Sequence, residues 1–191
     1  MNQPAPPDLG KIAYHGAMSA AKGWQDLLLA GPAYPHEEVE AAFQDYAARA
    51  NMNDWEHWCD MFTDKCLYVD HHFGVFHTRD EIAHWMVPLM ETQPELRFIP
   101  EWHVIQGNLV VNYNWNRWPN PGGSRVPYGE WRKPGPASEY LYQFPCVTLN
   151  IYGGGGKFCY EEDLYSPAAY LEILKTWRRD MGLEGAVQGS R

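Results

Sequence analysis

Residues 41–74 read AAFQDYAARANMNDWEHWCDMFTDKCLYVDHHFG, and this stretch decides the fold class. The apolar residues of its first part recur three and four positions apart, which is typical of one face of a helix that begins near His36. Asn53 and Asp54 predict the cap of a second helix, and residues 66–70 predict a short strand. The stretch therefore puts Tyr46 on the buried face of a helix and Asp70 at the end of a strand.

The rest of the chain predicts a third helix, a run of strands and a closing helix. Thr78, with Glu81 three residues later, forms a capping box for the third helix, and we expect Pro88 to kink or end that helix. Strands are predicted over residues 97–105, 109–118, 140–152 and 157–164, and the closing helix over residues 167–181. Helices followed by a run of antiparallel strands indicate the α+β class.

One domain accounts for most of the 191 residues. Residues 1–35 predict a proline-rich arm, in which only residues 19–30 favour a short helix that packs on the body or on a neighbouring subunit. Residues 36–181 form the predicted domain, and residues 182–191 a flexible tail. The Pro/Gly-rich loop over residues 119–138 is long enough to suggest a functional role.

The composition narrows the range of partners. The 15 Lys and Arg against 24 Asp and Glu give a net charge of −9 without a basic cluster, which argues against nucleic acids and anionic membranes. No run of 18 apolar residues and no secretory signal pattern is visible. Four separated cysteines without CxxC spacing indicate buried thiols in the cytoplasm. Nine Trp and twelve Tyr suit either a core or a deep pocket for a flat, neutral or phenolic ligand.

The pattern alone leaves two interpretations of Asp70 and Tyr46. A carboxyl buried beside aromatic rings has a raised pKa and becomes a better base near neutral pH. A tyrosine hydroxyl in the same cavity can donate a hydrogen bond to a developing enolate oxygen. Alternatively, Asp70 is an exposed turn residue and Tyr46 fills the core.

The quoted stretch resembles the N-terminal signature of ketosteroid isomerases in the nuclear-transport-factor-2-like, or SnoaL-like, superfamily. The similar features are QxY on the first helix, Asn-Asp between the helices, Phe-x-Asp at the end of the second helix, and Val-Asp followed by a glycine. The resemblance implies a cone-shaped, curved antiparallel sheet wrapped around helices, an α+β barrel. It also implies that Tyr46 stabilises an oxyanion, that Asp70 is the catalytic base, and that the chain forms a homodimer or higher homo-oligomer.

The chain departs from that family at one position. Ketosteroid isomerases add a protonated Asp to the oxyanion hole, whereas the corresponding strand here reads PCVTLNIY and offers Thr148 or Asn150. The missing donor argues against steroid isomerisation of the usual kind.

A second resemblance concerns His103. LRFIPEWHVIQG is similar to the strand-opening segment of scytalone dehydratase, in which a His acts as acid and base in an elimination. This similarity implies that His103 faces Asp70 across the cavity, with Tyr68 nearby. A structural or surface histidine is the alternative interpretation.

The predicted substrate pocket is lined by aromatic and small polar side chains: Tyr68, Trp58, Trp85, Asn116, Tyr142, Phe144 and Thr148. His71, His72 and His77 near Asp70 are metal-ligand types, but adjacent strand residues point to opposite faces, and no zinc or phosphate-binding motif is present. We therefore predict no metal and no cofactor.

Three functions follow from these observations. The first is a cofactor-independent lyase that dehydrates, or cleaves a C–C bond of, a phenolic, diaryl or polyketide-like aromatic molecule, with Asp70 and His103 as base and acid. The second is an isomerase or cyclase that acts through an enolate, with Asp70 and Tyr46. The third is a non-catalytic binding or assembly module.

Overall fold

The computed structural model describes residues 22–23, 25–26, 28–121 and 141–183. Its helices are α2 (His36–Arg49), α3 (Trp55–Cys59), α4 (Arg79–Glu91) and α5 (Pro167–Asp180). Its strands are β1 (Phe62–Asp70), β2 (Gly74–Thr78), β3 (Arg97–Gln106), β4 (Leu109–Arg117), β5 (Gln143–Gly154) and β6 (Lys157–Leu164). The tail beyond residue 183, most of the arm and most of the loop over residues 119–138 lie outside the described residues.

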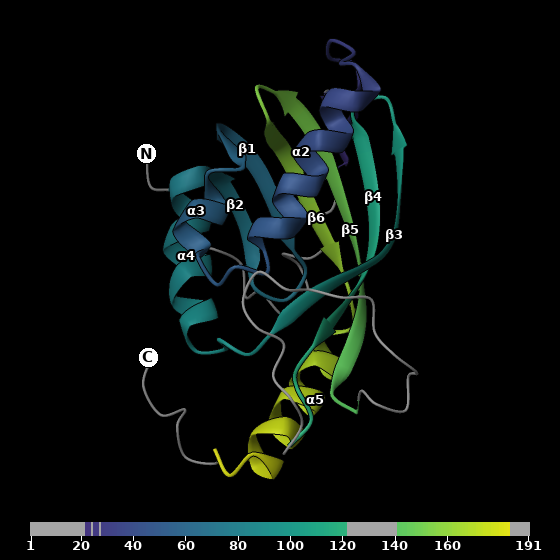
Figure 1. The fold of residues 1–191 in the computed structure, drawn as a ribbon. Coiled ribbons are helices and arrows are strands. Elements are labelled where there is room, and N and C mark those ends of the chain that lie inside the picture. Colours follow the sequence, from purple (N-terminus) through teal and green to yellow (C-terminus); the bar gives the residue numbers. More distant parts are fainter. Residues whose placement is uncertain (1–21, 24, 27, 122–140, 184–191) are drawn as a thin grey trace, which may run out of the picture.

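The six strands form one curved sheet in the order β2-β1-β6-β5-β4-β3. Helices α2, α3 and α4 lie against its concave side, and α5 lies at the lower end in Figure 1. The predicted α+β class, with a curved sheet around helices, is confirmed. Two predicted details of the sheet were wrong. The sheet is mixed and not purely antiparallel, because β1 pairs with β6 in parallel. The described sheet is also not a closed barrel, because its two edge strands, β2 and β3, do not pair with each other. The parallel pair arises because the first long strand lies beside the last one.

Two apolar clusters fill the two faces of the sheet. The larger cluster lies between the helices and the concave face and contains Val39, Phe43, Phe62, Ile82 and Trp177. The smaller one lies on the opposite face and contains Leu67, Val69, Ile151 and Tyr160, against which Leu28 of the arm packs. The part of the arm that is described therefore packs on the body, as predicted.

The helix caps agree with the sequence signals. The Asp54 carboxylate accepts a hydrogen bond from the backbone N–H of His57, and the Thr78 hydroxyl accepts one from Glu81. Pro88 does not end α4, which continues to Glu91. Its missing N–H costs the helix one backbone hydrogen bond, to the carbonyl four residues earlier. Strand β2 was not predicted, and its half-buried, irregular pattern lacks the alternation that identifies a strand.

Among the described residues, no helix combines the length and the apolar character that a membrane span requires. The four cysteines are free thiols, three of them buried, as the sequence predicted.

Candidate active site

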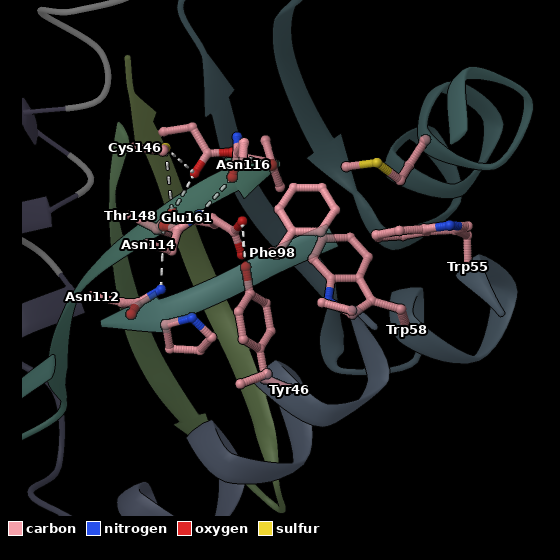
Figure 2. A pocket seen from close by; sticks show the side chains of 16 residues that line it. Tyr46, Trp55, Trp58, Phe98, Asn112, Asn114, Asn116, Cys146, Thr148 and Glu161 are labelled. Carbon is pink, nitrogen blue, oxygen red and sulfur yellow. Dashed lines mark hydrogen bonds between the residues drawn. The ribbon is translucent and has the colours of Figure 1, made fainter. Parts of the chain in front are cut away.

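A pocket of about 490 Å³, its open mouth included, lies between the helices and the concave face of the sheet. The pocket has two unlike ends, which Figure 2 shows on opposite sides of the view. One end is apolar and contains Trp55, Trp58 and Phe98. The other apolar lining residues are Ala47, Ala50, Met86 and Pro100. The other end is polar and is lined by Tyr46, Tyr68, Asn112, Asn114, Asn116, Cys146, Thr148, Glu161 and Asp163.

Strand alternation builds the polar end. Successive side chains of a strand point to opposite faces, so every second residue faces the pocket. On β6 these residues are Glu161 and Asp163, while Glu162 between them lies on the outer face with Tyr160 and Gln25. Strands β4 and β5 contribute their asparagines, Cys146 and Thr148 by the same rule. Two carboxyl groups thus lie side by side in one pocket.

Glu161 is the most deeply buried of these acids, with 1% of its surface exposed. Its Oε1 accepts a hydrogen bond from the Tyr46 hydroxyl at 2.8 Å, and its Oε2 accepts one from Asn150 Nδ2 at 2.7 Å. Burial raises the pKa of Glu161 well above its ordinary value, and the neighbouring charge of Asp163 raises it further. These effects outweigh the hydrogen bonds, which favour the charged form.

Asp163 is half-buried and has different partners. Its Oδ2 accepts a hydrogen bond from the Tyr68 hydroxyl at 2.5 Å, and its Oδ1 accepts one from Thr148 at 2.6 Å. Burial, followed by the charge of Asp70, raises the pKa of Asp163 to about 6. A carboxyl group with this pKa is charged at neutral pH and is a stronger base than an ordinary aspartate.

Each pocket acid is therefore paired with a tyrosine that also lines the pocket. Burial raises the pKa of both the Tyr46 and the Tyr68 phenols well above the ordinary value, and the nearby carboxylates raise it further. Both phenols consequently remain protonated donors at neutral pH.

A ladder of amides extends from Asp163 along β4. Asn112 donates to Asn114 at 3.3 Å, and Asn114 donates to Asn116 at 2.7 Å. The Thr148 hydroxyl links this ladder to Asp163. Asn112 Oδ1 is buried without a hydrogen-bond partner among the described residues, so the ladder presents an acceptor to the site.

The described lining residues include no Lys, Arg or His. An anionic ligand would therefore meet two carboxyl groups without a compensating cation, which is unfavourable. This arrangement favours a neutral ligand, as the sequence suggested.

Asp70 is buried, with 6% of its surface exposed, and burial raises its pKa. Its carboxylate does not line the pocket, however. Oδ1 accepts the backbone N–H groups of His72 and Phe73 at 2.7 and 2.8 Å, and the Tyr165 hydroxyl also donates to the carboxylate. The expectation that Asp70 faces Tyr46 is wrong in geometry, because the Tyr46 hydroxyl reaches Glu161.

His103 is also absent from the lining. Its Nε2 bonds to Glu40 at 2.8 Å, its ring packs on Phe43, and 25% of its side chain is exposed. Asp70 lies one strand away from Asp163 in the sheet, whereas His103 lies on the edge strand β3. The structure therefore does not bring Asp70 and His103 together, and their predicted roles as a facing base and acid fit this geometry poorly.

The predicted pocket residues fall into two groups. Trp58, Tyr68, Asn116 and Thr148 line the pocket together with Tyr46. The other three pack elsewhere: Trp85 stacks on Phe76, the Tyr142 hydroxyl bonds to Asp180, and Phe144 packs on Tyr165. Core packing and pocket lining use the same residue types, so composition could not separate the two groups.

Among the described residues, no group of three or more His, Cys, Asp or Glu side chains could hold a metal ion. His71 bonds to Glu162 on the outer face of the sheet, away from the pocket acids. We therefore assign no metal ligands among the described residues of this site.

Sequence reasoning missed Glu161 and Asp163. Their signal was present in FCYEEDLY, where three consecutive acids lie in a strand that is otherwise apolar and aromatic, so that the first and third share one face. Acids two residues apart share one face, and a buried face makes both of them candidates for shifted pKa values.

A family model described as a SnoaL-like domain matches residues 43–132. Among solved structures, TerC crystallised with polyporic acid is 14% identical, with a TM-score of 0.54 over 72% of this chain and 98% of TerC. A putative SnoaL-like polyketide cyclase from Jannaschia sp. CCS1 is 15% identical, with a TM-score of 0.54 over 75% of this chain and 96% of the cyclase.

An LEH-like epoxide hydrolase from M. tuberculosis is 13% identical, with a TM-score of 0.52 over 77% of this chain and 96% of the hydrolase. No curated protein was found to match the sequence. At these identities the structural likeness concerns the fold, and the chemistry has to be argued from the pocket.

Proposed function

Because the chain carries a SnoaL-like domain of the nuclear-transport-factor-2-like superfamily, we propose that it is a cofactor-independent lyase for a hydrophobic aromatic small molecule. The superfamily agrees with the resemblance of residues 41–74. The observation that carries the proposal is the placement of Glu161 and Asp163 on one face of β6, each bonded to a tyrosine, at the polar end of an aromatic pocket.

Asp163 acts as the general base in this proposal. Its pKa of about 6 leaves it charged at neutral pH and close to the pH at which base catalysis is most efficient. Thr148 and Tyr68 hold its two oxygens, which orients the carboxylate toward the pocket. Asp70 contributes by its charge from the neighbouring strand.

Glu161 acts as the general acid, with Tyr46 beside it. Its raised pKa favours the protonated form, and a neutral carboxyl group can donate a proton or a hydrogen bond to an oxygen that develops negative charge. Two carboxyl groups whose environments push their pKa values apart supply an acid and a base in one site.

In a dehydration, Asp163 accepts the proton from the carbon next to the aryl or carbonyl group. That C–H electron pair forms the C=C bond as the neighbouring C–O bond breaks, and Glu161 protonates the departing oxygen to give water. After a dehydration, Asp163 releases its proton to solvent and Glu161 takes one up, which restores both carboxyl groups. In a retro-aldol cleavage, Asp163 takes the hydroxyl proton and the C–C bond breaks, while the Glu161–Tyr46 pair stabilises the enolate oxygen. The enolate carbon then takes the proton from Asp163, which restores the base.

The substrate in this proposal is neutral and amphipathic. Its flat aromatic part contacts the apolar end near Trp58 and Phe98, and its reacting hydroxyl or carbonyl group lies at the polar end. The similar folds of TerC, which was crystallised with polyporic acid, and of the putative polyketide cyclase support an aromatic or polyketide-like molecule.

A second candidate is an isomerase or cyclase that acts through an enolate. The sequence lacked the second oxyanion donor at Thr148, but a protonated Glu161 next to Tyr46 would supply it from β6. In the isomerase case Asp163 takes a proton from one carbon atom and returns it to another, and no C–C or C–O bond breaks.

The test is turnover by the purified protein without added cofactor. Aryl β-hydroxy ketones probe both retro-aldol cleavage and dehydration, and a Δ5-3-ketosteroid probes isomerisation. Arylpropane-1,3-diols probe a related fragmentation, in which Asp163 takes the proton of the terminal hydroxyl, formaldehyde leaves, a C=C bond forms and Glu161 protonates the departing benzylic hydroxyl to give water. Products are identified by mass spectrometry, and the Asp163→Asn variant is the control. Turnover of a panel member that is lost in this variant supports the proposal. Binding without turnover across the panel would favour the non-catalytic binding module instead.

A further inference from the structure

The apolar end of the pocket contains an indole donor without a partner. Trp58 lines this end and has only 2% of its surface exposed. Its Nε1–H has no hydrogen-bond acceptor among the described residues. A buried tryptophan usually pairs its N–H, because an unpaired buried donor is unfavourable.

Packing prevents Trp58 from turning toward another acceptor. Its ring lies 5.4 Å from that of Tyr46, 5.4 Å from that of Trp55 and 5.0 Å from that of Phe62. Figure 2 shows the indole nitrogen on the side of the ring that faces Tyr46. The N–H is therefore held on the Tyr46 side of the indole, toward the polar end of the pocket.

We propose that Trp58 Nε1 donates a hydrogen bond to an oxygen on the aromatic part of the ligand, so that the site selects oxygenated aryl compounds over aromatic hydrocarbons. Aryl ketones, phenols and quinones carry such an oxygen. The inference rests on the proposed function only in placing the aromatic part of the ligand at the apolar end. Trp58 is thus a specificity residue, separate from the Glu161–Asp163 chemistry at the other end.

Among the described residues, three other tryptophans also have an unpaired indole N–H, but their positions differ from that of Trp58. These are Trp55, Trp85 and Trp118. Trp85 and Trp118 do not line the pocket, so no ligand can reach their N–H groups there. Trp55 lines the pocket but lies behind Trp58, farther from the polar end (Figure 2).

Equilibrium dialysis with two matched probes tests the proposal. 2-Acetylnaphthalene carries a carbonyl oxygen where 2-isopropenylnaphthalene carries a methylene group of similar shape. The wild-type protein is expected to bind the ketone about tenfold more tightly, as for a hydrogen bond of ordinary net strength. Trp58→Phe keeps a ring in place but removes the N–H, and its preference should fall to about twofold or less.

Trp118→Phe is the matched control, because it makes the same substitution at a fully buried tryptophan outside the pocket. It should retain the wild-type preference. The readout is binding and not turnover, so a failure of the proposed chemistry stays distinguishable from a failure of this inference. An unchanged ketone preference in Trp58→Phe, no preference in the wild type, or no binding of either probe would each overturn the inference.

Discussion

Asp70 and Asp163 are direct partners in the parallel pairing of β1 with β6. Their carboxyl groups consequently occupy neighbouring positions on the concave face, but their environments differ. Asp70 is held by two backbone N–H groups and by Tyr165, whereas Asp163 lines the pocket. The negative charge of Asp70 raises the pKa of Asp163. We therefore infer that Asp70 adjusts the base and that Asp163 is the base.

Asp70→Asn should move the pH dependence of turnover. The asparagine Oδ1 can still accept both backbone N–H groups, which bond to Oδ1 of Asp70, so the turn is kept and only the charge is lost. Without this charge the pKa of Asp163 falls, and the acidic midpoint of the rate profile should move down by roughly one pH unit. A loss of activity of a hundredfold or more in Asp70→Asn, with an unchanged acidic midpoint of the pH–rate profile, would indicate that Asp70 and not Asp163 is the base.

Asp163→Asn should lower turnover by at least about a hundredfold, because an amide cannot accept the proton. The matched control is Glu162→Gln, which changes the next residue of the same strand on the outer face. We expect the control to stay within about threefold of the wild-type rate. Equal losses in both variants would indicate damage to β6 and not a catalytic role.

Tyr46→Phe should lower kcat by about tenfold to a hundredfold, because it removes the hydroxyl beside the proposed acid. Tyr152→Phe is the control: its hydroxyl also donates to a glutamate, Glu38, but lies outside the pocket. Steady-state kinetics of both variants, with circular dichroism to confirm folding, separate the two positions. A Tyr46→Phe enzyme as fast as Tyr152→Phe would contradict the proposed acid pair.

The stability of the protein should depend on Asp163 between pH 4 and pH 6. Its folded-state pKa is raised from the ordinary 3.8 to about 6, so in this window the folded chain binds the proton more tightly than the unfolded chain. The stabilisation is present at low pH and is lost as the pH rises through 6. Relative to wild type, Asp163→Asn should therefore gain about 1–3 kcal/mol of unfolding free energy between pH 4 and pH 7.

Urea unfolding at pH 4 and at pH 7 measures this gain. Glu162→Gln again serves as the reference, because the pKa of Glu162 is lowered, mainly by His71, and its contribution has the opposite sign. Parallel pH dependences for wild type and Asp163→Asn would contradict the raised pKa of Asp163.

The helices and most strand positions could be predicted because they depend on local signals. The apolar spacing around Phe43, the Asp54 cap and the alternation along β4 are all contained in short segments. Tyr46 could be placed in the pocket for the same reason, since the buried face of α2 follows from its sequence.

The acids of the site could not be assigned from the sequence because their roles depend on distant pairings. Asp70 and Asp163 are 93 residues apart in number and meet only through the parallel β1–β6 pair. The Tyr46 hydroxyl reaches Glu161 across 115 positions. His103 appeared available for catalysis because nothing in its own strand predicts that Glu40 of α2 occupies its Nε2.

A carbon-13 NMR titration of the side-chain carboxyl groups tests the central claim most directly, with Asp163→Asn and Glu161→Gln to assign the two signals. The account predicts that Asp163 titrates with a midpoint near pH 6, while Glu161 stays protonated well above the ordinary glutamate range. Two carboxyl groups that both titrate near pH 4, as in unperturbed peptides, would contradict the assignment of an acid and a base to this pair.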